Sequence, residues 1–221
     1  MIPPIIKRLC NEPTAATRFL VLLLAADLVF ILIQIPYHMG MMSNPFFSIE
    51  ADMGYAEIYQ YIKEFWIILL LFGIAIQRPR AIYLAWMCLF IYVLCDDALS
   101  IHETVGRWIA TQLDLQPMFG LRSRDFGELM VSAVAGGVLF SSIGIAYFFS
   151  DLHGKTMSRH LVGLFALLVL FGVGVDMIHQ MVSFGKDFWG IVEDGGEMGV
   201  ISLMVWYLFN LQPPPPEVSP D

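Results

Sequence analysis

The stretch LVGLFALLVLFGVGVDMIHQM, at residues 161–181, indicates the fold class of this chain. Its residues are apolar without a break until Asp176, and His179 follows about one helical turn later. About 20 apolar residues are enough to cross a hydrocarbon core of about 30 Å as a helix. The stretch therefore predicts a membrane-spanning helix that carries two ionisable residues near one end.

Five other stretches have the same character. The 221-residue chain is 57% hydrophobic and only 14% charged, with a mean hydropathy of +0.69, which is too apolar for an ordinary soluble domain. Continuous apolar runs indicate helices, because membrane strands alternate apolar and polar residues. We therefore predict an all-α integral membrane protein, a bundle of six transmembrane helices. The predicted spans cover residues 19–37, 58–76, 81–100, 128–149, 161–181 and 192–210.

The basic residues predict the orientation, since lysine and arginine favour cytoplasmic loops. Seven of the twelve precede the first span or connect spans two to three and four to five. The five on the other side are Lys63, Arg107, Arg122, Arg124 and Lys186. We expect both termini in the cytoplasm and the protein in a bacterial inner (plasma) membrane.

The domain organisation is simple. One transmembrane domain is expected over residues 1–211, followed at 212–221 by a proline-rich tail that is expected to be disordered. No basic stripe is present, so we expect no nucleic-acid partner. The net charge of −8 indicates no acidic binding surface, because about half of the acids lie in or beside the spans.

The acids of the spans gather at one end. With a rise of about 1.5 Å per residue, they lie roughly 20 to 30 Å from the cytoplasmic flank. An ionisable residue in a bilayer is costly unless it is paired, hydrated or bound, so such a group predicts a functional site. Asp27 lies near mid-depth and is left out. The layer contains Glu64, Asp96, Asp97, His102, Glu103, Glu128, Asp176, His179, Glu193, Asp194 and Glu197.

The helical period tests which of these residues can face one another. Asp176 and His179 share a helix face, and the three acids at 193–197 fit within about 100° of arc. His102 points about 100° away from Glu103 on an ideal helix. Either the helix end is distorted there, or only one of the two enters the site. We favour a contribution from both.

Two imidazoles and several carboxylates from facing helices suit iron, manganese or zinc. We predict a di-metal centre of iron or manganese, with zinc as the alternative. The predicted ligands are Glu64, His102, Glu128, His179, Glu193 and Glu197. Glu103 and Asp176 are the predicted catalytic residues, and with Asp97 they are expected to orient the imidazoles or to act as alternative ligands.

Simpler roles are open for the same residues. Each carboxylate taken alone is more often solvated at the interface. Asp96 and Asp97 could form ion pairs with Arg107, Arg122 or Arg124, and Asp176 could bond only to His179. Ser132, Ala133, Gly136 and Gly137 form two small-x-x-x-small patterns, which predict close helix packing. The loop at 103–125 is long enough to cover the site.

These residues leave several functions open. We expect an oxidoreductase that acts on a lipid-soluble small molecule reached through the bilayer. One alternative is a zinc-dependent membrane hydrolase with Glu103 or Glu193 as general base. The others are an accessory subunit of a larger membrane complex and a proton- or cation-coupled transporter.

Overall fold

The computed structural model describes residues 15–182 and 184–212. Most of the predicted tail lies outside these residues. So do Lys7 and Arg8, two of the seven basic residues that predict the orientation. The described chain is helical and contains no strand. Its helices are α2 (Ala15–His38), η1 (Pro45–Phe47), α3 (Tyr55–Gln77), α4 (Ala81–Leu99), α5 (Ile101–Gln112), α6 (Ser123–Phe148), α7 (Leu152–Val169), η2 (Leu170–Val175), α8 (Asp176–Met181) and α9 (Lys186–Asn210).

Five helices are long and apolar enough to cross a membrane: α2, α3, α4, α6 and the continuous rod Leu152–Met181 formed by α7, η2 and α8. This result agrees with the predicted all-α membrane protein. The helix α9 is also long, with 25 residues, but it carries four acids in its first half.

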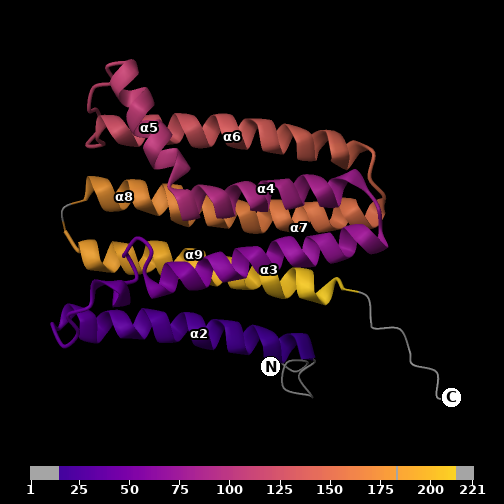
Figure 1. The fold of residues 1–221 in the computed structure, drawn as a ribbon, viewed down its shortest axis with the longest axis horizontal. Helices are drawn as coiled ribbons and strands as arrows, with labels where there is room; N and C mark the ends of the chain where they lie inside the picture. The colour runs from indigo at the N-terminus through magenta and orange to yellow at the C-terminus, as the bar shows by residue number, and fades with distance from the viewer. Residues whose placement is uncertain (1–14, 183, 213–221) are drawn as a thin grey trace, which may run out of the picture.

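The long helices lie side by side (Figure 1), and the short helix α5 crosses their end at an angle. The helix α2 packs on α9, which also contacts α3, and α6 lies at the opposite edge beside α4. The first turn of α2 and the last turn of α9 lie at the same end of the bundle. Trp86 is fully buried in the core between α4 and α7, where its indole N–H donates to Ser158 Oγ at 2.9 Å.

A single serine separates α4 from α5. Ser100 has φ 47° and ψ 48°, the left-handed conformation that residues other than glycine rarely adopt. The helix therefore stops at Leu99 and a new helix begins at Ile101 in another direction. His102 and Glu103 therefore belong to the first turn of α5 and not to the end of α4, and both line the cavity described below.

Two glycines hold α5 against α6. A Cβ added to Gly127 would meet the backbone carbonyl of Gly106, and one added to Gly106 would meet the backbone of Glu128. The two helices approach this closely because neither residue has a side chain. This contact brings the first turn of α5 next to the first turns of α6.

The rod α7–η2–α8 changes its winding near its polar end. The segment Leu170–Val175 is a π-helix, a form that is rare and frequent at functional sites. A Cβ at Gly172 would meet the Glu197 carboxylate, and one at Gly196 would meet the Phe171 ring. Glycines therefore allow η2 and α9 to touch where both carry ionisable residues.

A buried ion pair joins three helices in the middle of the bundle. The Lys63 ammonium donates to Asp27 Oδ1 at 2.9 Å, to the Met198 carbonyl at 2.8 Å and to Ser202 Oγ at 3.2 Å. Ser202 Oγ also donates to Asp27 Oδ2 at 2.5 Å. Lys63 lies within α3 and has no exposed surface, so the prediction that it is one of the basic residues on the non-cytoplasmic side is wrong.

Candidate functional site

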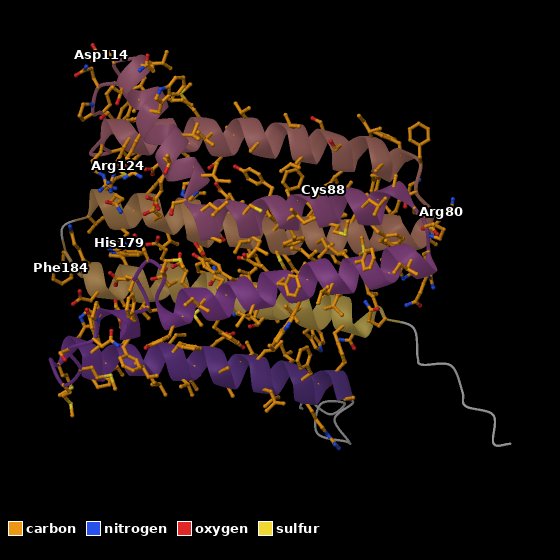
Figure 2. The ribbon with its side chains drawn as sticks, viewed as in Figure 1. Arg80, Cys88, Asp114, Arg124, His179 and Phe184 are labelled. Carbon is orange, nitrogen blue, oxygen red and sulfur yellow. The ribbon has the colours of Figure 1, made fainter. Side chains whose placement is uncertain are left out.

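The acidic end of the bundle encloses a cavity of about 720 Å³. Thirteen carboxylates line it, but only three arginines and two histidines. In Figure 2, His179 and Arg124 mark this end, and Arg80 marks the opposite end of the bundle. All eight predicted site residues line the cavity: Glu64, His102, Glu103, Glu128, Asp176, His179, Glu193 and Glu197. The structure therefore brings together side chains from four long helices and α5.

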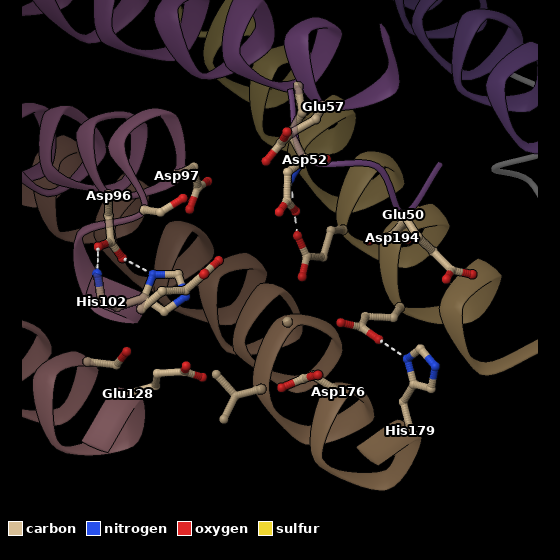
Figure 3. A pocket seen from close by; sticks show the side chains of 18 of the residues that line it. Glu50, Asp52, Glu57, Asp96, Asp97, His102, Glu128, Asp176, His179 and Asp194 are labelled. Carbon is tan, nitrogen blue, oxygen red and sulfur yellow. Dashed lines mark hydrogen bonds and ion pairs between the residues drawn. The ribbon is translucent and has the colours of Figure 1, made fainter. Parts of the chain in front are cut away.

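Each histidine of the cavity is held by a carboxylate through Nδ1. The His102 Nδ1 lies 3.0 Å from Asp96 Oδ2, and the His102 backbone N–H donates to Asp96 Oδ1 at 2.8 Å. The His179 Nδ1 lies 2.8 Å from Glu193 Oε2, and the two imidazoles lie on different sides of the cavity (Figure 3). Neither Nε2 makes a hydrogen bond within the described residues. A carboxylate on one ring nitrogen and a free second nitrogen is the usual arrangement of a metal-binding histidine.

The residues that orient the imidazoles differ from those we expected. Asp96, and not Asp97 or Glu103, holds His102. Glu193, which was predicted as a ligand, holds His179, whereas Asp176 accepts a bond from Gln180 at 3.2 Å. These partners depend on how each helix is rotated about its axis, which helical spacing does not define.

The arginines do not pair with Asp96 or Asp97. The Arg122 guanidinium lies 2.9 Å from Asp125, and Arg124 lies 3.6 Å from the same carboxylate. Both contacts are at the start of α6, where Asp125 also accepts a bond from the Arg122 backbone N–H. Among the described residues, these two arginines therefore form no ion pair with the deeper carboxylates of the cavity.

Glu64 is the deepest acid of the cavity and the least satisfied. It is fully buried, and no amide, hydroxyl or basic group of the described residues donates to either of its oxygens. The group within hydrogen-bonding reach is the carboxyl of Asp97. Glu64 has the acids Asp97 and Glu197 as neighbours, and Lys63 is committed to Asp27 and α9. A buried carboxylate without a donor is costly, so Glu64 requires a proton or a bound cation.

The donors surround the cavity rather than converge on one point. Within the described residues, no three His, Cys, Asp or Glu side chains form a group tight enough to hold a metal ion. Glu197 is tied to Gln60, whose amide donates to it at 3.1 Å. Side-chain rotation would be needed to bring carboxylates together around an ion.

One wall of the cavity consists of residues that were not predicted from the sequence. Glu50, Asp52, Glu57 and Gln60 line it from the loop before α3 and from the first turns of that helix. A Cβ at Gly190 would meet the Glu50 carboxylate, so this loop packs against α9. Acids in an outer loop were a usable signal, but only residues within apolar runs had been considered.

His102 lies on α5, outside the long helices, and its hydrogen bond to Asp96 raises its pKa above the ordinary value of 6.5. Asp97 and Glu103 add to this effect through their charges, and burial opposes it. A raised pKa means that the folded protein binds the proton more tightly than the unfolded chain. The resulting stability is fully present below pH 6.5 and is lost as the pH rises through the raised pKa.

We therefore expect the metal-free protein to lose thermal stability as the pH rises above 6.5, and the Asp96→Asn variant to lose less. The measurement is the midpoint of thermal unfolding in chelator at a series of pH values. Asp114→Asn, at an exposed position, serves as the control and should keep the wild-type slope. Equal slopes for wild type and Asp96→Asn would show that this pair does not couple to folding.

Comparisons with known proteins place the chain in one family. No curated protein and no solved structure matches it. One family model, described as a domain of unknown function (DUF8692), matches residues 16–211, from the first turn of α2 to the end of α9. The match includes every helix that lines the acidic cavity. The chain therefore belongs to the DUF8692 family.

Proposed function

We propose that this chain is an integral membrane metalloprotein whose acidic cavity holds a di-metal centre of iron or manganese. The observation that carries the proposal is Glu64, a fully buried carboxylate that lines the cavity and receives a hydrogen bond from no amide, hydroxyl or basic group of the described residues. A cation is the ligand that such a group lacks.

Two further features support a metal rather than a proton alone. Both histidines are anchored at Nδ1, which leaves Nε2 for a ligand. Thirteen carboxylates against three arginines leave an excess of negative charge that bound cations would offset. Mixed carboxylate and imidazole donors suit iron, manganese and zinc.

The proposed ligands are Glu64, His102, Glu128, His179 and Glu197, with Glu193 as both a ligand and the partner of His179. Glu128 and Glu197 come from α6 and α9 and line the same cavity as Glu64. Glu103 and Asp176 remain free to take up or give a proton beside the substrate. Bound iron or manganese would supply electron transfer, so we propose an oxidoreductase that acts on a lipid-soluble substrate.

We further propose that α9 is a sixth span. Both termini of the chain would then be cytoplasmic, and the protein would lie in a bacterial inner membrane. The helix α9 runs alongside the other long helices (Figure 1). Three of its four acids, Glu193, Asp194 and Glu197, line the cavity. Arg78, Arg80 and Arg159 are exposed at the end opposite the cavity, as cytoplasmic residues would be.

Elemental analysis of the purified protein tests the metal. We expect about two iron or manganese ions per chain, in line with di-metal sites of helical bundles. The double variant His102→Ala/His179→Ala should lose most of this metal, because each substitution removes a nitrogen ligand. One zinc ion per chain would favour the hydrolase instead. No transition metal would contradict both enzyme proposals and leave the accessory-subunit and transporter hypotheses.

The matched control is His153→Ala/His160→Ala. These histidines bond to Tyr83 and Tyr207 at 2.9 Å and do not line the cavity. This variant loses the same number of imidazoles, so unchanged metal content would assign the effect to the cavity. Equal loss in both double variants would point to general damage and count against the proposed ligands.

A further inference from the structure

An apolar groove of about 380 Å³ lies beside the acidic cavity. Leu115 and Met118, from the loop after α5, form one side. The other side is one face of α6, with Phe126, Leu129, Met130 and Ala133 at the helical spacing i, i+3, i+4 and i+7. Its volume falls within the range of about 300 to 1,000 Å³ that is typical of ligand sites.

The groove continues along α6 as an open furrow. Ala133 is exposed, and a Cβ added to Gly136 or Gly137 would meet nothing within 4 Å. The small-x-x-x-small patterns were predicted to pack helices together, but within the described chain no helix covers these glycines. Val134 and Val138 stand exposed beside the furrow, at 69% and 63%. This face of α6, at the edge of the bundle in Figure 1, therefore borders lipid.

Leu129 lies between the groove and the cavity, because it lines both. One side of this leucine is apolar, and the other leads to a space bounded by carboxylates and histidines. An occupant of both spaces must have an apolar chain with a polar end. A second copy of α6 offers an apolar face but no such end.

We propose that the groove binds the aliphatic chain of a single-chain membrane lipid, whose polar end passes Leu129 into the acidic cavity. The chain lies over Ala133 and Gly137 and enters from the bilayer, without crossing water. This assignment names the substrate class of the cavity and rests on the proposed function.

The probe is a long-chain primary alcohol with a diazirine in mid-chain, whose neutral head is not repelled by the carboxylates. The full-length protein in phosphatidylcholine nanodiscs is irradiated with the probe, and the adducts are located by mass spectrometry. We expect adducts at Leu115, Met130 and Ala133 that disappear when unlabelled hexadecanol is added in excess. A site of limited capacity behaves in this way, whereas boundary lipid does not.

Ala133→Trp fills the groove, and Val134→Trp places the same side chain on the neighbouring lipid-facing surface. We expect the adduct yield of Ala133→Trp to be about tenfold lower. This is the loss of affinity expected when about two methylene groups of the lipid chain are no longer buried in the groove. Val134→Trp should label like the wild type. If Ala133→Trp elutes as aggregate, Ala133→Leu replaces it, with a smaller loss expected.

Two results would overturn the proposal. Adducts spread evenly over the groove, Val134 and Val138, without competition, would show ordinary boundary lipid. A wild-type dimer that Ala133→Trp converts to a monomer, with labelling unchanged, would show that a second copy covers the furrow. Metal content is measured on the same samples, with and without chelator. Labelling that hexadecanol suppresses, in protein without bound metal, would refute the metal centre and support the lipid groove. Bound metal without such labelling would refute the lipid groove and support the metal centre.

Discussion

Lys63→Met is expected to lower the midpoint of thermal unfolding by on the order of 10 °C. The substitution leaves the buried Asp27 carboxylate with only the Ser202 hydroxyl as donor, and it removes the bond to the Met198 carbonyl. Breaking a buried ion pair by removing one partner costs about 3 to 5 kcal/mol, because the remaining charge stays uncompensated. The effect should be large here, since the pair joins α2, α3 and α9.

The double variant Asp27→Leu/Lys63→Met separates this explanation from lost packing. The double variant removes both charges. Its unfolding midpoint should therefore lie well above those of the single variants Lys63→Met and Asp27→Leu. Lys186→Met, at the exposed start of α9, controls for the loss of a lysine. The unfolding of purified protein in one detergent is followed for all four variants. A midpoint for Lys63→Met within error of Lys186→Met would contradict the role of the pair.

Glu64→Gln is expected to act in opposite directions with and without metal. In chelator the variant should be more stable than the wild type by about 1 to 3 kcal/mol, because a buried carboxylate without a donor is removed. The introduced amide can also donate to Asp97, its neighbour in the cavity. With added metal, the wild type should gain about 2.7 kcal/mol at a concentration 100 times Kd, and the variant should gain much less.

Glu57→Gln is the matched control for this substitution. Glu57 lies two turns before Glu64 on the same face of α3 and also lines the cavity, but it accepts a hydrogen bond from the Met53 backbone. We expect Glu57→Gln to be no more stable than the wild type in chelator. We also expect it to lose less of the stabilisation by added metal than Glu64→Gln does. Thermal unfolding with and without Mn²⁺ measures both quantities. A Glu64→Gln variant that responds to metal like the wild type would exclude Glu64 as a ligand.

The membrane-spanning class follows from local composition, because a helix that crosses lipid needs only enough consecutive apolar residues. The stretch at 161–181 met this condition, and the structure contains one continuous helical rod over Leu152–Met181. It was also predictable that the acids gather at one end of the bundle, since the position of a residue along its helix gives its depth in the membrane. Glu64, Glu128 and Glu197 accordingly meet in one cavity although they belong to three helices.

Only the tertiary structure decided which partners these residues have. Asp96 and Glu193 hold the histidines because of helix rotations and a left-handed Ser100, which depend on contacts with other helices. Lys63 turns inward because Asp27 and α9 offer three acceptors far away in the sequence. The sequence by itself therefore determined the class of the protein and the level of its polar residues, which depend on properties along each helix. The pairing of side chains and the groove beside α6 depend on contacts between helices, which were decided by packing.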